Sequence, residues 1–131
     1  MMPETFLFII NPKAGGRAKH DLNELIAQQA KQLNKPFEIV LTTHAGHAFE
    51  LASFIDENKY IAIVAVGGDG TINEVGRGLI NKSVALAIVP MGSGNGLARY
   101  LKIPLNVVKA IDNAFTGKIV GMDVIQMNNH F

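Results

Sequence analysis

A single carboxylate lies inside a glycine cluster that follows an apolar run, in the segment Ala65-Val66-Gly67-Gly68-Asp69-Gly70-Thr71. The glycines allow positive φ and let backbone N–H groups approach an anion with no Cβ in the way. Thr71 would open a helix, whose positive N-terminal end attracts phosphate. Asp69 would repel that phosphate unless a divalent cation or a hydroxyl donor lay between them. The segment therefore indicates metal-assisted phosphate chemistry, with a tight turn in which Asp69 caps the helix as the alternative.

Three further segments combine glycine with hydrogen-bonding side chains directly after apolar runs. They are Asn11-Pro12-Lys13-Ala14-Gly15-Gly16-Arg17, Thr42-Thr43-His44-Ala45-Gly46-His47 and Pro90-Met91-Gly92-Ser93-Gly94-Asn95-Gly96. In a parallel sheet, the segments that follow the strands all lie at one edge. Together, the segments predict one polyphosphate or nucleotide cleft rather than a set of unrelated turns.

The elements that must position these segments alternate between short apolar strands and helix-period stretches. The strands are apolar on both faces, which is typical of a parallel sheet covered on both sides. We therefore expect an α/β fold with three layers, a mostly parallel sheet and helices on both faces. Strands are expected at residues 6–10, 37–41, 61–66, 85–89 and within 119–127. Helices are expected from Asp21, over 47–57, after Thr71, after Asn95 and from Pro104 to Gly117.

Composition excludes several classes of function. The 131 residues are 48% hydrophobic, enough for one domain with a real core. A net charge of +1 gives no broad electrostatic field that would attract nucleic acid. The phenylalanines occupy expected core positions and are not expected to stack on bases, so no nucleic acid partner is expected. The absence of cysteine excludes disulfides and thiol nucleophiles and suits the cytoplasm. No apolar run in the sequence approaches the length of a membrane span.

Two familiar nucleotide-binding motifs are missing from the sequence. No Gly-Lys-Ser/Thr follows the first strand, and Gly92-Ser93-Gly94-Asn95-Gly96-Leu97 breaks the GxGxxG spacing. A P-loop ATPase and a Rossmann dehydrogenase are therefore disfavoured. His44 and His47 are three residues apart but lack a third ligand nearby, so we expect His47 to begin a helix rather than to bind a metal.

Three motifs in register carry a family resemblance. NPKAGG at 11–16, GGDGTINEV at 67–75 and MGSGNGLAR at 91–99 resemble the diacylglycerol kinase catalytic domain family, which includes sphingosine kinases and bacterial lipid kinases. The resemblance implies a fold like the N-terminal domain of phosphofructokinases and NAD kinases. In NAD kinases the Asn-Glu pair belongs to a later motif, whereas Asn73-Glu74 here follows the Gly-Asp-Gly loop directly.

The resemblance implies a kinase that uses ATP and Mg²⁺ and transfers the γ-phosphoryl group to a lipid hydroxyl, of diacylglycerol or of a sphingoid base. Gly96 replaces the Asp found in many diacylglycerol-type members, which favours the sphingoid-base branch. The resemblance implies a lipid partner at the membrane surface. It also implies that this protein is cytoplasmic and touches the inner face of the membrane, and it allows a homodimer. The alternatives are an NAD kinase-like or sugar kinase and, for this chain alone, a nucleotide-binding module without turnover.

The resemblance also assigns residues to the site. Asp69 is the catalytic candidate and would hold the Mg²⁺ of Mg-ATP, while Thr71 would offer its hydroxyl and N–H to a phosphate. Asn73 and Glu74 would hold the first helical turn, or be merely solvated there. The nucleotide-binding positions implied are Asn11, Pro12, Lys13, Ala14, Gly15, Thr42, Gly68, Asp69, Gly70, Thr71, Ile72, Asn73, Glu74 and Ser93.

Members of the family are longer than this chain and carry a second, β-rich domain. We therefore expect residues 1–131 to be the nucleotide-binding domain, with 117–131 as the approach to the second domain. In the bacterial members the catalytic base, the structural metal ligands and most of the lipid pocket belong to that second domain. Asp123 lies where the family turns into it.

Overall fold

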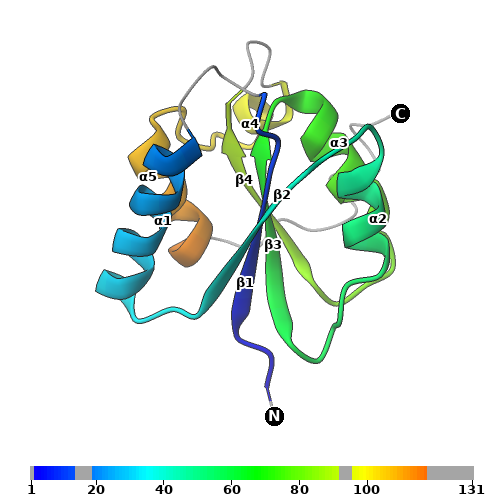
Figure 1. Ribbon diagram of the computed structural model, residues 1–131, viewed down its shortest axis with the longest axis horizontal. Helices are drawn as coiled ribbons and strands as arrows, with labels where there is room; N and C mark the ends of the chain where they lie inside the picture. The colour runs from blue at the N-terminus through cyan, green and yellow to red at the C-terminus, as the bar shows by residue number, and fades with distance from the viewer. Residues whose placement is uncertain (1, 14–18, 92–95, 118–131) are drawn as a thin grey trace.

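Parallel strands form the centre of the molecule, as the apolar segments predict (Figure 1). The computed structural model describes residues 2–13, 19–91 and 96–117. Within these residues the strands are β1 (Thr5–Ile10), β2 (Phe37–Leu41), β3 (Tyr60–Gly67) and β4 (Ala85–Pro90). They form one four-stranded sheet in the order β2-β1-β3-β4, and every neighbouring pair is parallel. The strand expected within 119–127 lies outside the described residues.

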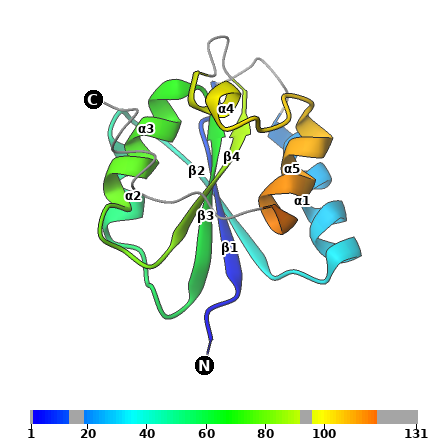
Figure 2. The same cartoon turned by 180° about the vertical axis from the view of Figure 1, so that it is seen from behind.

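Helices cover both faces of this sheet, so the predicted three-layer arrangement is confirmed. Figures 1 and 2 show α1 (Lys19–Leu33) and α5 (Val107–Thr116) on one face and α2 (His47–Ser53) and α3 (Asp69–Gly78) on the other. The short helix α4 (Gly96–Tyr100) lies at the edge where the strands end. Within the described part of the chain, no helix is long and apolar enough to span a bilayer.

The sequence of β1 explains why both faces are covered. Phe6, Phe8 and Ile10 enter the core beneath α1 and α5, whereas Leu7 and Ile9 enter the core beneath α2 and α3. All are at most 8% exposed, so neither face of β1 reaches solvent. A strand that is apolar at every position needs a helical layer on each side to bury it.

Several helix boundaries differ from those the sequence predicts. The helix expected over 47–57 ends at Ser53, because Asp56 forms a turn in which its carbonyl accepts the N–H groups of Lys59 and Tyr60. The last helix begins at Val107 rather than at Pro104. Its cap is Asn106, whose side chain accepts the N–H of Lys109 at 3.0 Å.

The boundaries of two other helices also shift. Helix α3 begins at Asp69, ahead of the expected Thr71, so the acid belongs to the first helical turn. Helix α1 already includes Lys19, ahead of the expected cap at Asp21.

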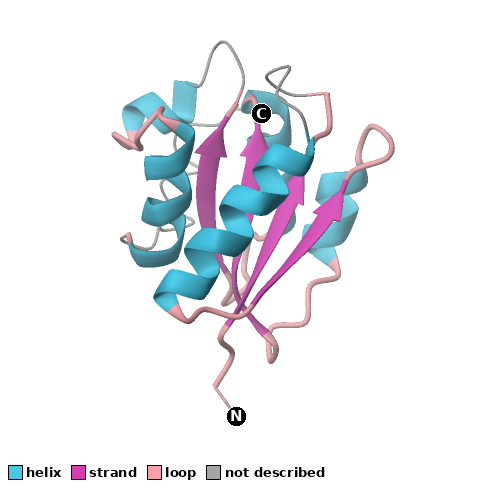
Figure 3. Ribbon diagram, turned by 60° about the vertical axis from the view of Figure 1, so that its left-hand side comes forward, coloured by secondary structure: helices cyan, strands magenta, loops and turns pink. Residues whose placement is uncertain are grey.

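The chain order creates a crevice at one point of the sheet. After β1 the chain enters α1 on one face, whereas after the neighbouring β3 it enters α3 on the opposite face. Figure 3 shows all strand arrows pointing to the same edge, which is therefore where these two loops diverge. Ligands of open α/β sheets bind at such a switch point, outside the carboxyl ends of the strands.

Helices α2 and α3 approach each other closely at Gly78. A Cβ at this position would lie 2.5 Å from Cβ of Ala52, 2.9 Å from the carbonyl oxygen of Phe49 and 3.0 Å from the N atom of Ser53. Two of these three neighbours are backbone atoms, which cannot move without shifting α2. The contact therefore requires glycine even though alanine is the better helix former.

We predict that Gly78→Ala lowers the free energy of unfolding by about 1–3 kcal/mol, because the methyl group overpacks the helix interface. The matched control is Gly70→Ala in the same helix, where a Cβ would meet nothing within 4 Å. The control should be neutral or more stable by about 0.4–1 kcal/mol. Urea denaturation followed by circular dichroism measures both, and equal stability of the two variants would contradict the packing described for Gly78.

Candidate active site

Asn11 joins the loop after β1 to the helix after β3. Its N–H donates to the carbonyl of Val66 at 3.1 Å, which continues the pairing of the two strands past the end of β1. Its side-chain Nδ2 donates to Oγ1 of Thr71 at 3.4 Å, and its Oδ1 accepts the N–H of Lys13 at 3.0 Å. One amide side chain therefore connects both sides of the switch point.

The N-terminus of α3 presents backbone donors at this place, and the described part of the chain offers them no partner. The first helical hydrogen bond runs from the N–H of Ile72 to the carbonyl of Gly68 at 3.1 Å. The N–H groups of Asp69, Gly70 and Thr71 therefore precede the helical ladder, and Gly68 supplies no side-chain cap to occupy them. Unpaired N–H groups and the helix dipole both favour an anion.

The glycines of this loop leave room for neighbouring atoms and do not adopt positive φ. Glycine allows positive φ at Gly67, Gly68 and Gly70, but the structure does not use it there: among the described glycines only Gly46 has positive φ, and Gly68 is extended at φ −90°. At Gly67 the constraint is close approach, because a Cβ there would lie 2.7 Å from Oγ1 of Thr71. The bare backbone lets the Thr71 hydroxyl sit where Asn11 can donate to it.

Asp69 connects α3 to α4. Its Oδ1 accepts the N–H of Gly96 at 2.9 Å, so it binds the first residue of another helix instead of capping its own. A side chain at residue 96 would begin 3.9 Å from Oδ2 of Asp69. An acid at position 96 would therefore place a second negative charge close to Asp69. Gly96 avoids this repulsion.

A polar cavity of about 240 Å³ opens between the first two loops and α3. Six of the predicted nucleotide-binding residues line it, together with four that the prediction did not include. The predicted ones are Asn11, Pro12, Lys13, Thr42, Thr71 and Glu74, and the additional ones are Thr43, His44, Ala45 and Ala48. Thr43 and His44 lie in a predicted loop but were not assigned to the site, since His44 was considered there only as a metal ligand.

The remaining predicted residues have other places. Ile72 is 2% exposed and packs in the core, so its side chain is turned away from this edge. Asn73 has a buried Oδ1 that accepts no hydrogen bond from the described part of the chain. Ala14, Gly15, Ser93 and Asp123 lie outside the described residues.

A larger cavity of about 660 Å³ lies elsewhere, along β4 and against α5. Most of its lining residues are of apolar type, as at Ala87, Ile88 and Phe115, and its charged residues are Glu4, Lys35 and Lys102. None of its described lining residues carries a hydroxyl group or belongs to the N-terminus of a helix, although Asn34 and Asn113 contribute amides. The chemistry of the lining therefore favours the smaller cavity as the anion and nucleotide site.

The described residues contain no cluster of three or more His, Cys, Asp or Glu side chains that could hold a metal ion. Asp69 offers a carboxylate next to the N–H groups at the start of α3. A single carboxylate suits Mg²⁺, which is commonly bound by one or two carboxylates together with substrate phosphates.

Comparisons with known proteins agree with this fold and with these motifs. The chain is 32% identical over 126 residues to the diacylglycerol kinase of Bacillus subtilis, covering 94% of this chain and 42% of that protein. It is 42% identical over 100 residues to sphingoid long-chain bases kinase 1 of Arabidopsis thaliana, covering 70% of this chain and 13% of that protein. The crystal structure of a diacylglycerol kinase from Bacillus anthracis superposes with a TM-score of 0.73 at 32% identity, over 83% of this chain and 40% of that one.

The chain thus spans about two fifths of the length of its bacterial relatives. The model of the diacylglycerol kinase catalytic domain matches residues 5–127, which is nearly the whole chain. The parallel sheet and the relatives agree with this match. The chain therefore belongs to the diacylglycerol kinase catalytic domain family, whose members are lipid kinases.

Proposed function

We propose that this chain is the ATP-binding part of a lipid kinase and holds the nucleotide at the β1/β3 switch point. The observation that carries the proposal is the bond from Asn11 to Thr71, which brings the first loop to the N-terminus of α3 beside a polar cavity. Because the family consists of kinases, the anion that this site would take is the polyphosphate of ATP.

Charge decides how ATP would lie in this site. The phosphates belong at the N–H groups of Asp69, Gly70 and Thr71, where the helix dipole is positive. Glu74 lies one turn further along α3 and lines the cavity, so its carboxylate would repel phosphate but accept hydroxyl groups. The nucleoside would therefore occupy the cavity side, with its ribose hydroxyls near Glu74.

Mg²⁺ fits the same arrangement. Asp69 would supply one carboxylate oxygen, and the phosphates and water would supply the other ligands. The ion neutralises charge on the phosphates when bound. Asp69 then has two roles, since it also accepts the N–H of Gly96.

The reaction itself is a proposal for the whole protein. Transfer of the γ-phosphoryl group to a lipid hydroxyl needs an acceptor site and a general base, which we place in a second domain outside this chain. A sphingoid base is the favoured acceptor, supported by Gly96 and by the identity to the plant sphingoid-base kinase. Diacylglycerol is the second candidate, supported by the bacterial relatives. Both acceptors are membrane lipids, so the protein would work at a membrane surface.

We predict that ATP binds this chain more tightly with Mg²⁺ than without, and that Asp69→Asn removes this difference. The asparagine keeps an oxygen that can accept the Gly96 N–H but loses the charge that holds the cation. Asp69→Ala should also lose that hydrogen bond and about 0.5–1.5 kcal/mol of stability. Calorimetric titration and thermal unfolding measure the two effects separately. An Asp69→Asn variant whose affinity still rises with Mg²⁺ would show that Asp69 does not hold the ion.

For the full-length protein, we predict transfer of labelled phosphate from ATP to a sphingoid base or to diacylglycerol in mixed micelles. Asp69→Ala in that protein should reduce turnover by a hundredfold or more, because charge stabilisation at the phosphates is commonly the largest catalytic contribution. NAD and free sugars are the control acceptors. Labelling of NAD or a sugar, with no labelled lipid, would refute a lipid kinase.

A further inference from the structure

The loop between β2 and α2, residues 42–46, forms one wall of the polar cavity through Thr42, Thr43, His44 and Ala45. It leads into a helix of seven residues whose N-cap, Gly46, has φ +87° and makes no side-chain cap. Thr42 is anchored to the sheet, because its N–H donates to the carbonyl of Ile10 at 2.9 Å. The next residues leave the sheet, so their position depends on contacts from α2.

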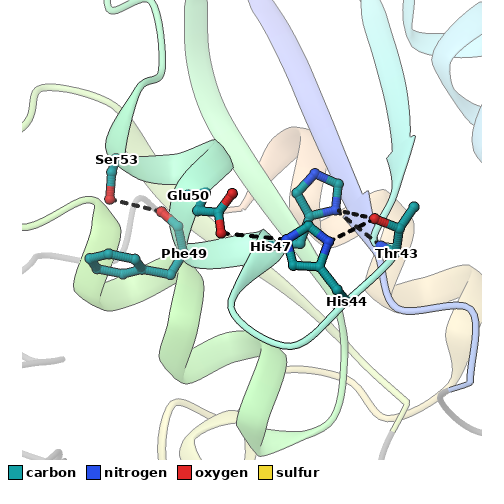
Figure 4. A network of polar contacts seen from close by, with 6 residues as sticks. All are labelled: Thr43, His44, His47, Phe49, Glu50 and Ser53. Atoms are coloured by element: carbon teal, nitrogen blue, oxygen red, sulfur yellow. Dashed lines mark hydrogen bonds and ion pairs between the residues drawn. The ribbon is translucent and has the colours of Figure 1, made fainter.

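His47, the first residue of α2, provides such a contact. Its Nδ1 accepts the backbone N–H of Thr43 at 3.0 Å and lies 3.4 Å from Oγ1 of the same residue (Figure 4). A backbone N–H can only donate, so Nδ1 of His47 must carry a lone pair and the ring proton must be on Nε2. The contact therefore requires an acceptor at the Nδ1 position and not merely an aromatic ring.

His44 joins the same network from the loop side. Its ring stacks on that of His47 with centroids 4.6 Å apart and planes at 12°. Its Nδ1 lies 2.9 Å from Oγ1 of Thr43, and its Nε2 lies 3.4 Å from Oε2 of Glu50. Thr43 and His44, both of which line the cavity, are thus held by side chains of the first turn of α2.

We propose that His47 is a positioning residue for nucleotide binding: by accepting the Thr43 N–H, it holds the β2–α2 loop in the shape that closes the cavity. This inference rests on the proposed function, because it assumes that the cavity takes the nucleotide. His47 does not line the cavity itself and acts through Thr43 and His44. Without this contact the loop would populate other conformations. The apparent affinity for nucleotide would then fall in proportion to the fraction of molecules that remain competent to bind.

The test compares three substitutions by calorimetric titration with Mg-ATP. His47→Ala removes the acceptor and should weaken binding roughly three- to tenfold, the effect expected for one exposed hydrogen bond. His47→Asn places an amide oxygen near the position of Nδ1 and should restore most of the affinity. His47→Gln extends the amide towards the Nε2 position and should not. Rescue by asparagine but not by glutamine distinguishes positioning from simple packing of the ring.

Ser53→Ala is the matched control, because it removes a side-chain hydrogen bond of 2.8 Å to the carbonyl of Phe49 in the same helix but away from the loop. Its affinity for Mg-ATP should equal that of the unmodified protein. Hydrogen exchange of the Thr43 amide, followed by NMR, reports on the loop without nucleotide. Exchange should be faster in His47→Ala and slow again in His47→Asn.

The outcomes separate this inference from the function on which it rests. If the unmodified protein binds Mg-ATP and His47→Ala binds equally well, the inference is overturned while the ATP site stands. If the unmodified protein does not bind Mg-ATP, the proposed function is overturned, and the inference with it. Weakened binding in His47→Ala, rescue in His47→Asn and faster Thr43 exchange in the alanine variant would together support it.

Discussion

The pairing of β1 with β3 is the constraint on which the rest of the structure depends. Both strands are buried on both faces, and they lie side by side in register from Phe6 with Ala62 to Ile10 with Val66. Because their helices leave on opposite faces, the loops diverge and open a crevice at the carboxyl edge. The backbone bond from Asn11 to Val66 and the bare backbone at Gly67 then fix how closely the two loops approach.

The polar contacts at this edge connect separate loops to one another. Asn11 reaches Thr71, Asp69 reaches Gly96, and His47 holds Thr43. Each contact involves a backbone group or a hydroxyl group, so these contacts fix the positions of the loops relative to one another. This suits a kinase, in which catalysis depends mainly on positioning and on neutralising the phosphates. The backbone donors at the start of α3 lie at the same edge of the sheet.

The strands and the edge at which the loops meet could be predicted because runs such as 6–10 and 61–66 are apolar at nearly every position. The ends of helices were less predictable, because α2 stops where Asp56 forms a turn and α5 starts at Asn106, and both depend on local hydrogen bonds. The partner of Asp69 could not be predicted, because the bond joins residues 27 apart in two different loops. The contact between His47 and Thr43 was missed because it joins a helix side chain to a backbone N–H of the preceding loop, and the residue pattern does not reveal the shape of that loop.

The central claim is that ATP binds at the β1/β3 edge and not in the larger cavity along β4. An NMR titration of the ¹⁵N-labelled chain with Mg-ATP tests this most directly, because it reports each backbone amide separately. We expect the largest shifts at Gly68, Gly70 and Thr71, with smaller ones at Lys13 and Thr43. Shifts concentrated at Ala87, Ile88 and Phe115, which line the larger cavity, would contradict the claim.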